Sequence, residues 1–345
     1  MGLEREDVLF LNASEVEAAL SGQELELVRL VRRAYEQHVA GMSVVPHSTL
    51  LRFPGRGSDR IMALPAWLGG DSELAGIKWV SSVPSNPSRG LERASAVIVL
   101  NDIETGRARV LMEGSLVNAR RTAASAVLAA QVLHDEKSPQ RVALLGCGRI
   151  QMEILHFLRI VFPSLRRAAV LDIDRGAADR FARTVTELHD GLDLTIKDSL
   201  DELFASAPLI SIATTAPAPY IGLDVLAAAP PGATLLHVSL RDLAPEVVLT
   251  AQNVVDDVAH VCRAETSLHL AEQQVGHRGF VHGALGDMTA AGRWERSDPG
   301  RAVVFSPFGL GILDLVVADL VCRRAQERGL GTPLRGFFPP PITLS

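Results

Sequence analysis

Short apolar runs alternate with helical patterns between residues 140 and 258. The segment after the first run repeats Ile150, Ile154, Leu155 and Leu158 on one helical face. Strands that alternate with helices are typical of a parallel sheet covered by helices. The pattern predicts one Rossmann-like α/β domain, with strands at Val142–Leu145, Ala168–Ile173, Leu192–Ile196, Leu209–Ala213, Thr234–Val238 and Val254–Val258.

The first 120 residues have a different pattern, typical of a mixed α+β sheet. A helix is expected at Gln23–Val39, and Asn101–Gly106 has the Asn, Asp and Gly residues of a hairpin turn. The Ala-rich stretch Thr122–Leu133 predicts a helix that leads into the Rossmann part. Strands are expected at Thr49–Phe53, Arg60–Pro65, Gly76–Val80 and Ala94–Leu100.

Two domains are expected, and one of them is discontinuous. Gly311–Glu327 predicts another amphipathic helix, which Pro339–Pro341 cannot continue. We expect this helix to fold back onto the first part of the chain. The domains are then residues 1–125 with 305–345, and residues 126–304. A length of 345 residues is suited to about two domains.

Composition narrows the class of protein. The net charge is −6, and 47% of the residues are hydrophobic, which indicates a globular chain without a nucleic-acid partner. The apolar runs are shorter than the ~20 residues of a membrane span, and Met1–Asp7 is too acidic for a signal peptide. The three cysteines are far apart, so neither a disulfide framework nor a metal site is expected. A reducing cytoplasm fits these features.

A glycine-rich turn, Gly146-Cys147-Gly148, directly follows a predicted strand and opens a helix. Two glycines allow a tight turn and close approach of a pyrophosphate, and the helix N-terminus offers free N–H groups to the anion. Gln151 replaces the third glycine of the usual fingerprint. Because a Gly-x-Gly also occurs as a structural turn, the strand and the helix around it favour cofactor binding by this run, Arg149 and Ile150 included.

Asp172 closes the second predicted strand, 24 positions after Gly148. A carboxylate at this place can hold a ribose 2′-hydroxyl and repel a 2′-phosphate, which favours NAD over NADP. The alternative is a helix N-cap, a role that Asp174 could also serve. Thr214 and Thr215 follow the fourth strand at the edge where such folds bind ligands, although they could simply form a turn.

Some cationic side chains occur at positions where the pattern predicts apolar residues. Lys78 lies inside the apolar run Gly76–Val80, and Arg120-Arg121-Thr122 stands at the expected start of the Ala-rich helix. Cations are unfavourable at a helix N-terminus, so the pair suggests a nearby anion, which Arg can bind in a bidentate manner. The alternative is that one Arg is solvated and the other pairs with a surface acid.

Asp242 belongs to the segment His237–Asp242, which runs off the fifth predicted strand. A carboxylate just past the carboxyl end of a strand can face the nicotinamide and act as a general acid or base. The alternative is an ordinary aspartate in a surface loop.

Six segments occur in the order and spacing of a known family: Gly76–Lys78, Ala94–Leu100, Thr105-Gly106, Arg121–Ala126, Gly146-x-Gly148 and Phe308–Asp314. Over nearly its whole length, the chain resembles the ornithine cyclodeaminase/μ-crystallin family. It departs from the cyclodeaminases at Asp242–Glu246, where they have Asp-x-Pro-Gly-Lys, and at Pro307, where they have serine. It is more similar to the branch that oxidises N-(2-amino-2-carboxyethyl)-L-glutamate for siderophores of the staphyloferrin B type, in the segments Pro46–Ser48, Leu51–Pro54, Glu92–Ile98, Met112–Ser115, Ser239–Asp242 and Phe305–Gly309.

The resemblance implies a Rossmann-fold NAD domain and a discontinuous α+β domain for substrate binding and dimerisation, hence a homodimer. It implies that NAD⁺ takes hydride from the glutamate α-carbon and that water cleaves the imine to 2-oxoglutarate and L-2,3-diaminopropionate. It further implies that Lys78 and Arg121 face the substrate, that Thr122 lies near the cofactor phosphates, and that Asp242 transfers protons.

The expected site combines these arguments. A substrate with three carboxylates suits several cations, and Arg52 and Arg93 are included on charge alone. Three alternatives stay open: an ornithine cyclodeaminase, an alanine dehydrogenase-like enzyme, and a μ-crystallin-like ligand-binding protein or imine reductase. The assignments are catalytic Asp242 and Lys78; substrate-binding Arg52, Lys78, Arg93 and Arg121; and cofactor-binding Arg121, Thr122, Gly146, Gly148, Arg149, Ile150, Gln151, Asp172, Thr214, Thr215 and Ser239.

Overall fold

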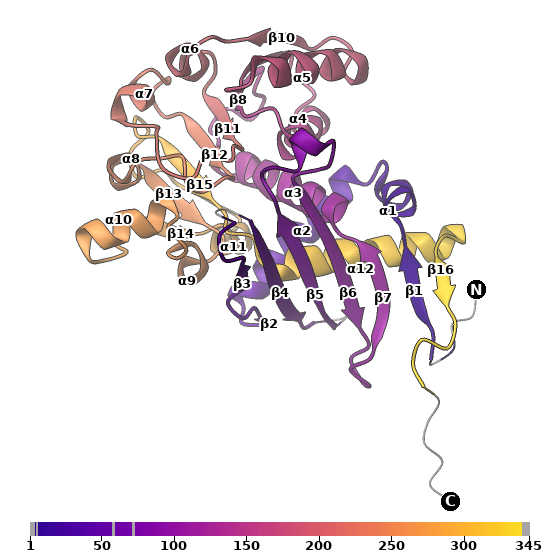
Figure 1. Ribbon diagram of the computed structural model, residues 1–345. Helices are drawn as coiled ribbons and strands as arrows, with labels where there is room; N and C mark the ends of the chain where they lie inside the picture. Colours follow the sequence, from indigo (N-terminus) through magenta and orange to yellow (C-terminus); the bar gives the residue numbers. More distant parts are fainter. Residues whose placement is uncertain (1–3, 5, 57–58, 71–72, 340–345) are drawn as a thin grey trace, which may run out of the picture. The chain divides into compact units, whose positions relative to one another are not determined.

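The computed structural model describes residues 4, 6–56, 59–70 and 73–339 (Figure 1). Residues 1–3, 5, 340 and 341, which belong to the two terminal segments discussed above, lie outside this range. The chain forms two compact units: unit 1 is Met1–Arg121 with Leu310–Ser345, and unit 2 is Thr122–Gly309. The predicted boundaries, 125/126 and 304/305, lie four and five residues away from these.

Unit 1 holds a mixed sheet with the strand order β16-β1-β7-β6-β5-β4-β2 in its described residues, and β3 pairs with β4. Alternate positions of β5 and β6 are buried, among them Lys78, Val80 and Ile98. Helix α12 packs against β4, β5 and β6 and crosses behind the sheet in Figure 1. The elements are β1 (Val8–Leu11), α1 (Ala13–Leu20), α2 (Glu24–Val39), β2 (Ser43–Val44), β3 (Thr49–Arg52), β4 (Arg60–Leu68), β5 (Leu74–Ser82), η1 (Pro87–Arg89), β6 (Ala94–Asn101), β7 (Ala108–Glu113), α12 (Gly311–Arg328) and β16 (Thr332–Leu334).

Helix α3 (Ser115–Leu133) begins seven residues before the expected start at Thr122. The Glu113 carboxylate accepts the N–H groups of Ser115 (2.6 Å) and Leu116 (3.1 Å), so it satisfies donors that a first turn leaves open. Arg120 and Arg121 therefore lie in the second turn, and the prediction of cations at a helix N-terminus was wrong. The first unit boundary falls within this helix.

Unit 2, all of whose residues are described, contains an eight-stranded parallel sheet in the order β10-β9-β8-β11-β12-β15-β13-β14. The six predicted strands are present, and β14 and β15 were not predicted. Apolar residues of α6, α8 and α10 join the core of this sheet. The elements are β8 (Arg141–Leu145), α4 (Arg149–Val161), β9 (Arg167–Leu171), α5 (Arg175–Leu188), β10 (Asp193–Ile196), α6 (Leu200–Ala205), β11 (Leu209–Ile212), α7 (Leu223–Ala227), β12 (Thr234–His237), α8 (Pro245–Thr250), β13 (Gln252–Val255), α9 (Val258–Val261), α10 (Ser267–Val275), β14 (Val281–Ala284), α11 (Leu285–Ala291) and β15 (Val303–Ser306).

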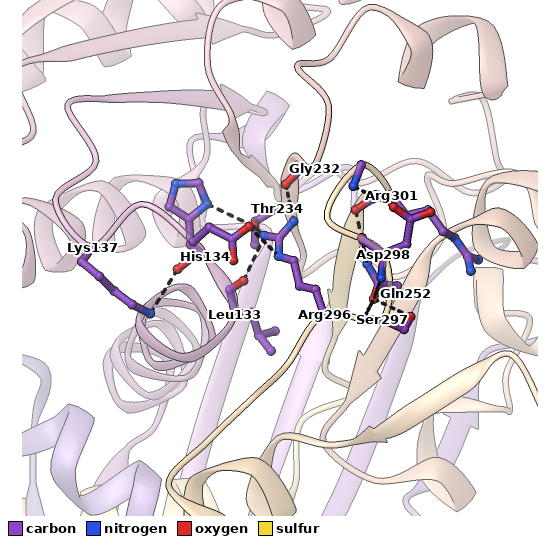
Figure 2. A network of polar contacts seen from close by, with 12 residues as sticks. Leu133, His134, Lys137, Gly232, Thr234, Gln252, Arg296, Ser297, Asp298 and Arg301 are labelled. Atoms are coloured by element: carbon purple, nitrogen blue, oxygen red, sulfur yellow. Dashed lines mark hydrogen bonds and ion pairs between the residues drawn. The ribbon is translucent and has the colours of Figure 1, made fainter.

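Arg296, whose side chain is 4% exposed, links the end of α3 to the start of β12 (Figure 2). Arg296 donates to the carbonyl of Leu133 (3.0 Å) and to the Thr234 hydroxyl (2.9 Å). A guanidinium at a helix C-terminus satisfies free carbonyls and complements the helix dipole. His134 Nδ1 lies 3.0 Å from the same hydroxyl, and burial lowers the pKa of this imidazole to about 4, so it stays neutral. The contacts hold the start of the strand that carries His237 at its other end.

Candidate active site

The two glycines of the turn after β8 have different roles. Gly146 has a φ of +93°, and a side chain there would place its Cβ 2.4 Å from the Ala213 carbonyl oxygen. The fold therefore requires glycine at this position. Gly148 is the N-cap of α4, and a Cβ built on it meets nothing within 4 Å. Gly148 thus borders open space at a helix N-terminus, where free N–H groups favour an anion.

The side chain of Gln151 is fully buried beneath this turn. Its Oε1 accepts from the Ser211 hydroxyl (3.1 Å), and its Nε2 points to the Ser211 carbonyl (3.4 Å). These bonds join α4 to β11 where the usual third glycine would allow close packing. Gln151 therefore supports the turn, while Arg149 is exposed and Ile150 half-buried in the first turn of α4.

Asp172 directly follows β9 and binds the glycine turn. One of its oxygens accepts the N–H of Cys147 (2.8 Å), and the other accepts the N–H of Asp174 (2.9 Å). Asp174, not Asp172, caps α5, because its side chain accepts the N–H of Gly176. Asp172 is half-buried and keeps lone pairs for further donors. Burial, aided by the Asp172 charge, raises the pKa of the Cys147 thiol to about 12, so this thiol stays protonated.

Asp242 is completely buried, so it is not an aspartate of a surface loop. Its carboxylate accepts from the hydroxyls of Thr214 and Ser239 and lies 3.2 Å from His237 Nε2. The turn before it passes through Leu240 with a φ of +71°, a conformation that residues other than glycine seldom adopt. Such strain is often found at functional sites. Burial raises the pKa of Asp242, but the bonds from His237, Ser239 and Thr214 outweigh this and hold it below the usual value.

Two further polar residues complete this cluster in unit 2. His237 Nδ1 lies 3.0 Å from the hydroxyl of Ser306, and both side chains are fully buried. Tyr220 donates its backbone N–H to the Asp242 carbonyl (2.9 Å), and its phenol is close enough to Asp242 and Thr214 for both to shift its pKa. The sequence reasoning assigned no role to His237 or Tyr220. Tyr220 lies 22 positions before Asp242, and no local pattern joins the two.

In unit 1, Lys78 and Arg121 converge on one carboxylate. Lys78 Nζ lies 2.7 Å from one oxygen of Asp314, and Arg121 Nε lies 3.1 Å from the other. Both cations also donate to Asn118 Oδ1, at 2.8 Å and 2.7 Å. All three charged side chains are buried, and two cations share one anion. Burial, together with the Arg121 charge, lowers the pKa of Lys78 to about 8.

Asp314 was missed as a site residue although the sequence contains a signal. It is the one acidic residue in the first turn of α12, where its neighbours are apolar and buried. A charged residue in such surroundings needs a partner of opposite charge. Arg120, by contrast, donates to the Leu20 carbonyl (2.7 Å) and lies 3.5 Å from Glu24.

The other two cations that were predicted to bind the substrate, Arg93 and Arg52, have different surroundings. Arg93 is half-buried, and its Nη1 donates to the hydroxyl of Ser82 (2.8 Å). Burial lowers the pKa of this guanidinium, and no carboxylate among the described residues pairs with it. Arg52 lies exposed at the end of β3. Of the remaining cofactor candidates, Thr122 is buried in α3, Thr215 is exposed, and Ser239 is half-buried.

Unit 2 combines a parallel sheet, a glycine turn, an open helix N-terminus and an acidic residue after the second strand. These features define a Rossmann-type dinucleotide-binding protein, here with a second α+β unit. The family model of the ornithine cyclodeaminase/mu-crystallin family matches residues 6–329. The chain belongs to this family, as its sequence motifs predicted.

Individual relatives span nearly the whole chain. It is 30% identical to N-((2S)-2-amino-2-carboxyethyl)-L-glutamate dehydrogenase of Staphylococcus aureus, with 95% of this chain and 98% of the relative covered. The structure of Thermococcus litoralis Delta(1)-pyrroline-2-carboxylate reductase with NADH and L-proline is similar, with a TM-score of 0.86, 27% identity and coverage of 94% and 99%. An archaeal alanine dehydrogenase dimer with bound NAD gives a TM-score of 0.84, 25% identity and coverage of 96% and 100%.

No helix in the described part of the chain is both long and apolar enough to cross a bilayer.

Proposed function

We propose that the chain is an NAD-dependent dehydrogenase that converts N-(2-amino-2-carboxyethyl)-L-glutamate to 2-oxoglutarate and L-2,3-diaminopropionate. The observation that carries the proposal is the excess of buried cations in unit 1. Among the described residues, Lys78 and Arg121 have one carboxylate between them, that of Asp314, and Arg93 donates to a hydroxyl and pairs with no carboxylate. Buried cations need counter-ions, and a substrate with three carboxylates supplies them. The relative from Staphylococcus aureus, named for this substrate, supports the assignment.

The glycine turn of unit 2 suits NAD. Gly148 leaves room for a pyrophosphate, the N–H groups of α4 meet its charge, and Asp172 can accept the ribose hydroxyls. We assign Arg121, Thr122, Arg149, Ile150, Thr214, Thr215 and Ser239 to the cofactor as well, with Gln151 beneath the turn. When bound, the nicotinamide accepts a hydride.

The reaction divides into an oxidation and a hydrolysis. Loss of hydride from the glutamate α-carbon and of the proton from the amine nitrogen leaves a C=N bond. Water then adds to the imine carbon, and the C–N bond breaks to give the ketone of 2-oxoglutarate and the free amine. Asp242 takes the proton at the first step and returns one to the leaving nitrogen. Lys78, Arg121, Arg93 and Arg52 bind carboxylates in this scheme, and Lys78 also polarises the reacting group.

One assay separates this proposal from the alternatives. The protein is incubated with NAD⁺ and, in separate reactions, the conjugate, L-ornithine, L-alanine and L-proline, while NADH absorbance and products are followed. We expect NADH and equimolar 2-oxoglutarate from the conjugate. Proline formed from ornithine without net NADH, with the conjugate inert, would show a cyclodeaminase instead. NADH formed only with alanine or proline would show an oxidoreductase of monocarboxylic amino acids.

We further infer a homodimer formed through the sheet of unit 1. Strand register aligns Phe10, Leu111, Val99, Ile77 and Pro65 across the face that lies opposite to Lys78. On the same face, Trp79 and Val97 are paired neighbours with 44% and 36% exposure. A broad apolar face is typical of an interface between proteins. The dimeric archaeal alanine dehydrogenase supports a second copy as the partner.

A further inference from the structure

The proposed base cannot meet a substrate directly in this structure. Asp242 is 0% exposed, and its two oxygens are surrounded by Thr214, Ser239 and His237. A general acid or base must lie within hydrogen-bonding reach of the proton that it transfers, directly or through one intermediary. A proton that moves between Asp242 and the substrate therefore needs a carrier.

Tyr220 has the position of such a carrier. Tyr220 is 43% exposed, whereas Thr214 and Ser239 are half-buried. The N–H groups of Tyr220 and Ile221 both bind the Asp242 carbonyl at 2.9 Å, which fixes this segment beside the aspartate. Pro219 precedes Tyr220 and restricts the backbone there. The phenol lies close enough to the Asp242 carboxylate and the Thr214 hydroxyl for both groups to shift its pKa.

We propose that the Tyr220 phenol relays protons between Asp242 and the reacting amine or water. This inference rests on the function proposed above. In the forward step, the phenolic oxygen accepts a proton from the substrate while the phenol gives its own proton to an oxygen of Asp242. The return step reverses both transfers and protonates the leaving nitrogen. Tyr220 is neutral before and after each step, so neither atoms nor charge are gained or lost in the relay.

The charges around the phenol agree with a neutral carrier. Partial burial, then the Asp242 carboxylate and more weakly that of Asp172, raise the pKa of Tyr220, and the Thr214 hydroxyl opposes them. His237 stands behind Asp242, between it and Ser306. Thr214 and Ser239 already donate their single protons to Asp242, and aliphatic hydroxyls ionise less readily than a phenol. His237 is accordingly a positioning residue for Asp242.

Tyr220→Phe removes only the hydroxyl and tests the relay. With any substrate that the wild type oxidises, we expect kcat to fall by about 10²-fold, the usual effect of losing acid–base catalysis. The dissociation constant for NADH, measured by fluorescence, should change by less than about twofold, since binding does not use the phenol. Tyr35→Phe, which removes the only other tyrosine hydroxyl of the chain, is the control and should leave kcat unchanged. An unchanged kcat in Tyr220→Phe would overturn the relay.

A second measurement does not depend on activity. In the Tyr35→Phe background, Tyr220 is the sole phenol, and its ionisation can be followed by tyrosinate absorbance. We expect its pKa to lie above the ordinary value and to decrease when Asp242→Asn is added, because the neighbouring charge is removed. A phenol that titrates identically with and without Asp242 would contradict the relay. A wild type inactive toward the conjugate would instead count against the proposed function.

Discussion

The buried and half-buried cations of unit 1 differ in how their charges are balanced. Arg120 meets Glu24 and a backbone carbonyl, so its charge serves the fold. Lys78 and Arg121 have one carboxylate between them, and that shared ion, Asp314, opposes the lowering of the Lys78 pKa to about 8. The protonation of Lys78 therefore changes within the pH range in which an enzyme can be assayed.

This gives a prediction for pH dependence. Lys78 is charged below a pH of about 8 and neutral above it, so KM for the conjugate should rise as the pH increases through 8. Lys78→Arg should remove the rise, because guanidinium stays charged. Asp314→Asn removes the carboxylate that favours the ammonium, so the rise should move to lower pH. Steady-state kinetics between pH 6 and about 10 would measure all three.

Asp319→Asn is the matched control for Asp314→Asn. Asp319 lies on the same helix but pairs with Arg109 (3.5 Å) and Arg323 (3.1 Å), which are more exposed. Pairs of this kind contribute little, so the KM profile should match that of the wild type. If the KM profile of Asp314→Asn also matched that of the wild type, Asp314 would have no part in controlling the protonation of Lys78.

At the scale of elements, the two glycines of the turn between β8 and α4, which flank Cys147, have different roles: one serves folding and the other binding. Gly146→Ala should destabilise the protein by about 1–3 kcal/mol, because of its positive φ and the contact with Ala213. Gly148→Ala has room for its methyl group and costs at most about 1 kcal/mol at an N-cap. Its methyl group enters the space that we assign to the pyrophosphate, so the Kd for NADH should rise about tenfold.

Thermal unfolding without ligand and NADH fluorescence titration distinguish the two variants. Gly146→Ala should lower Tm by several degrees, whereas Gly148→Ala should keep a Tm close to the wild type. Tight NADH binding by a folded Gly148→Ala protein would mean that the pyrophosphate does not approach this glycine.

The elements that the sequence predicted have strong apolar runs. Strands β8, β11 and β12 are buried at nearly every position, so their composition is unambiguous. Two strands of unit 2 were missed: in β14 the residues His282 and Gly283 interrupt the apolar pattern, whereas β15 is a buried apolar run that was overlooked. The start of α3 was missed because its first two turns carry asparagine and two arginines, and its stabilising carboxylate lies before the helix, on Glu113.

Only those residues of the candidate site that stand out in the local sequence were predicted. Lys78, Asp172 and Asp242 each stand out against their local pattern. Their partners come from distant positions: Asp314 lies 236 residues from Lys78, and Tyr220 is held at Asp242 by backbone pairing. Strand register and helix packing decide which charged groups become neighbours and pair, and a linear pattern does not contain that information.

At the scale of the whole molecule, the net charge of −6 does not describe the sheet of unit 1. One face of this sheet buries Lys78 beneath α12, and the opposite face carries exposed apolar side chains, among them Trp79 and Val97. A sheet face of this kind is a liability in a monomer and is commonly covered by another chain. The dimer inferred above would bury Trp79 against a second copy.

Trp79→Glu tests the dimer without disturbing the core, because the side chain is already 44% exposed and points away from α12. The wild type should have about twice the chain mass of 37.0 kDa by light scattering, and the variant should have the mass of one chain at the same concentration. A charge buried in an apolar interface costs several kcal/mol, enough to dissociate a dimer at micromolar concentration. Leu25→Glu, on α2 and 55% exposed, adds the same charge elsewhere in unit 1 and should stay dimeric. A Trp79→Glu protein that keeps the dimer mass would place the interface on another face.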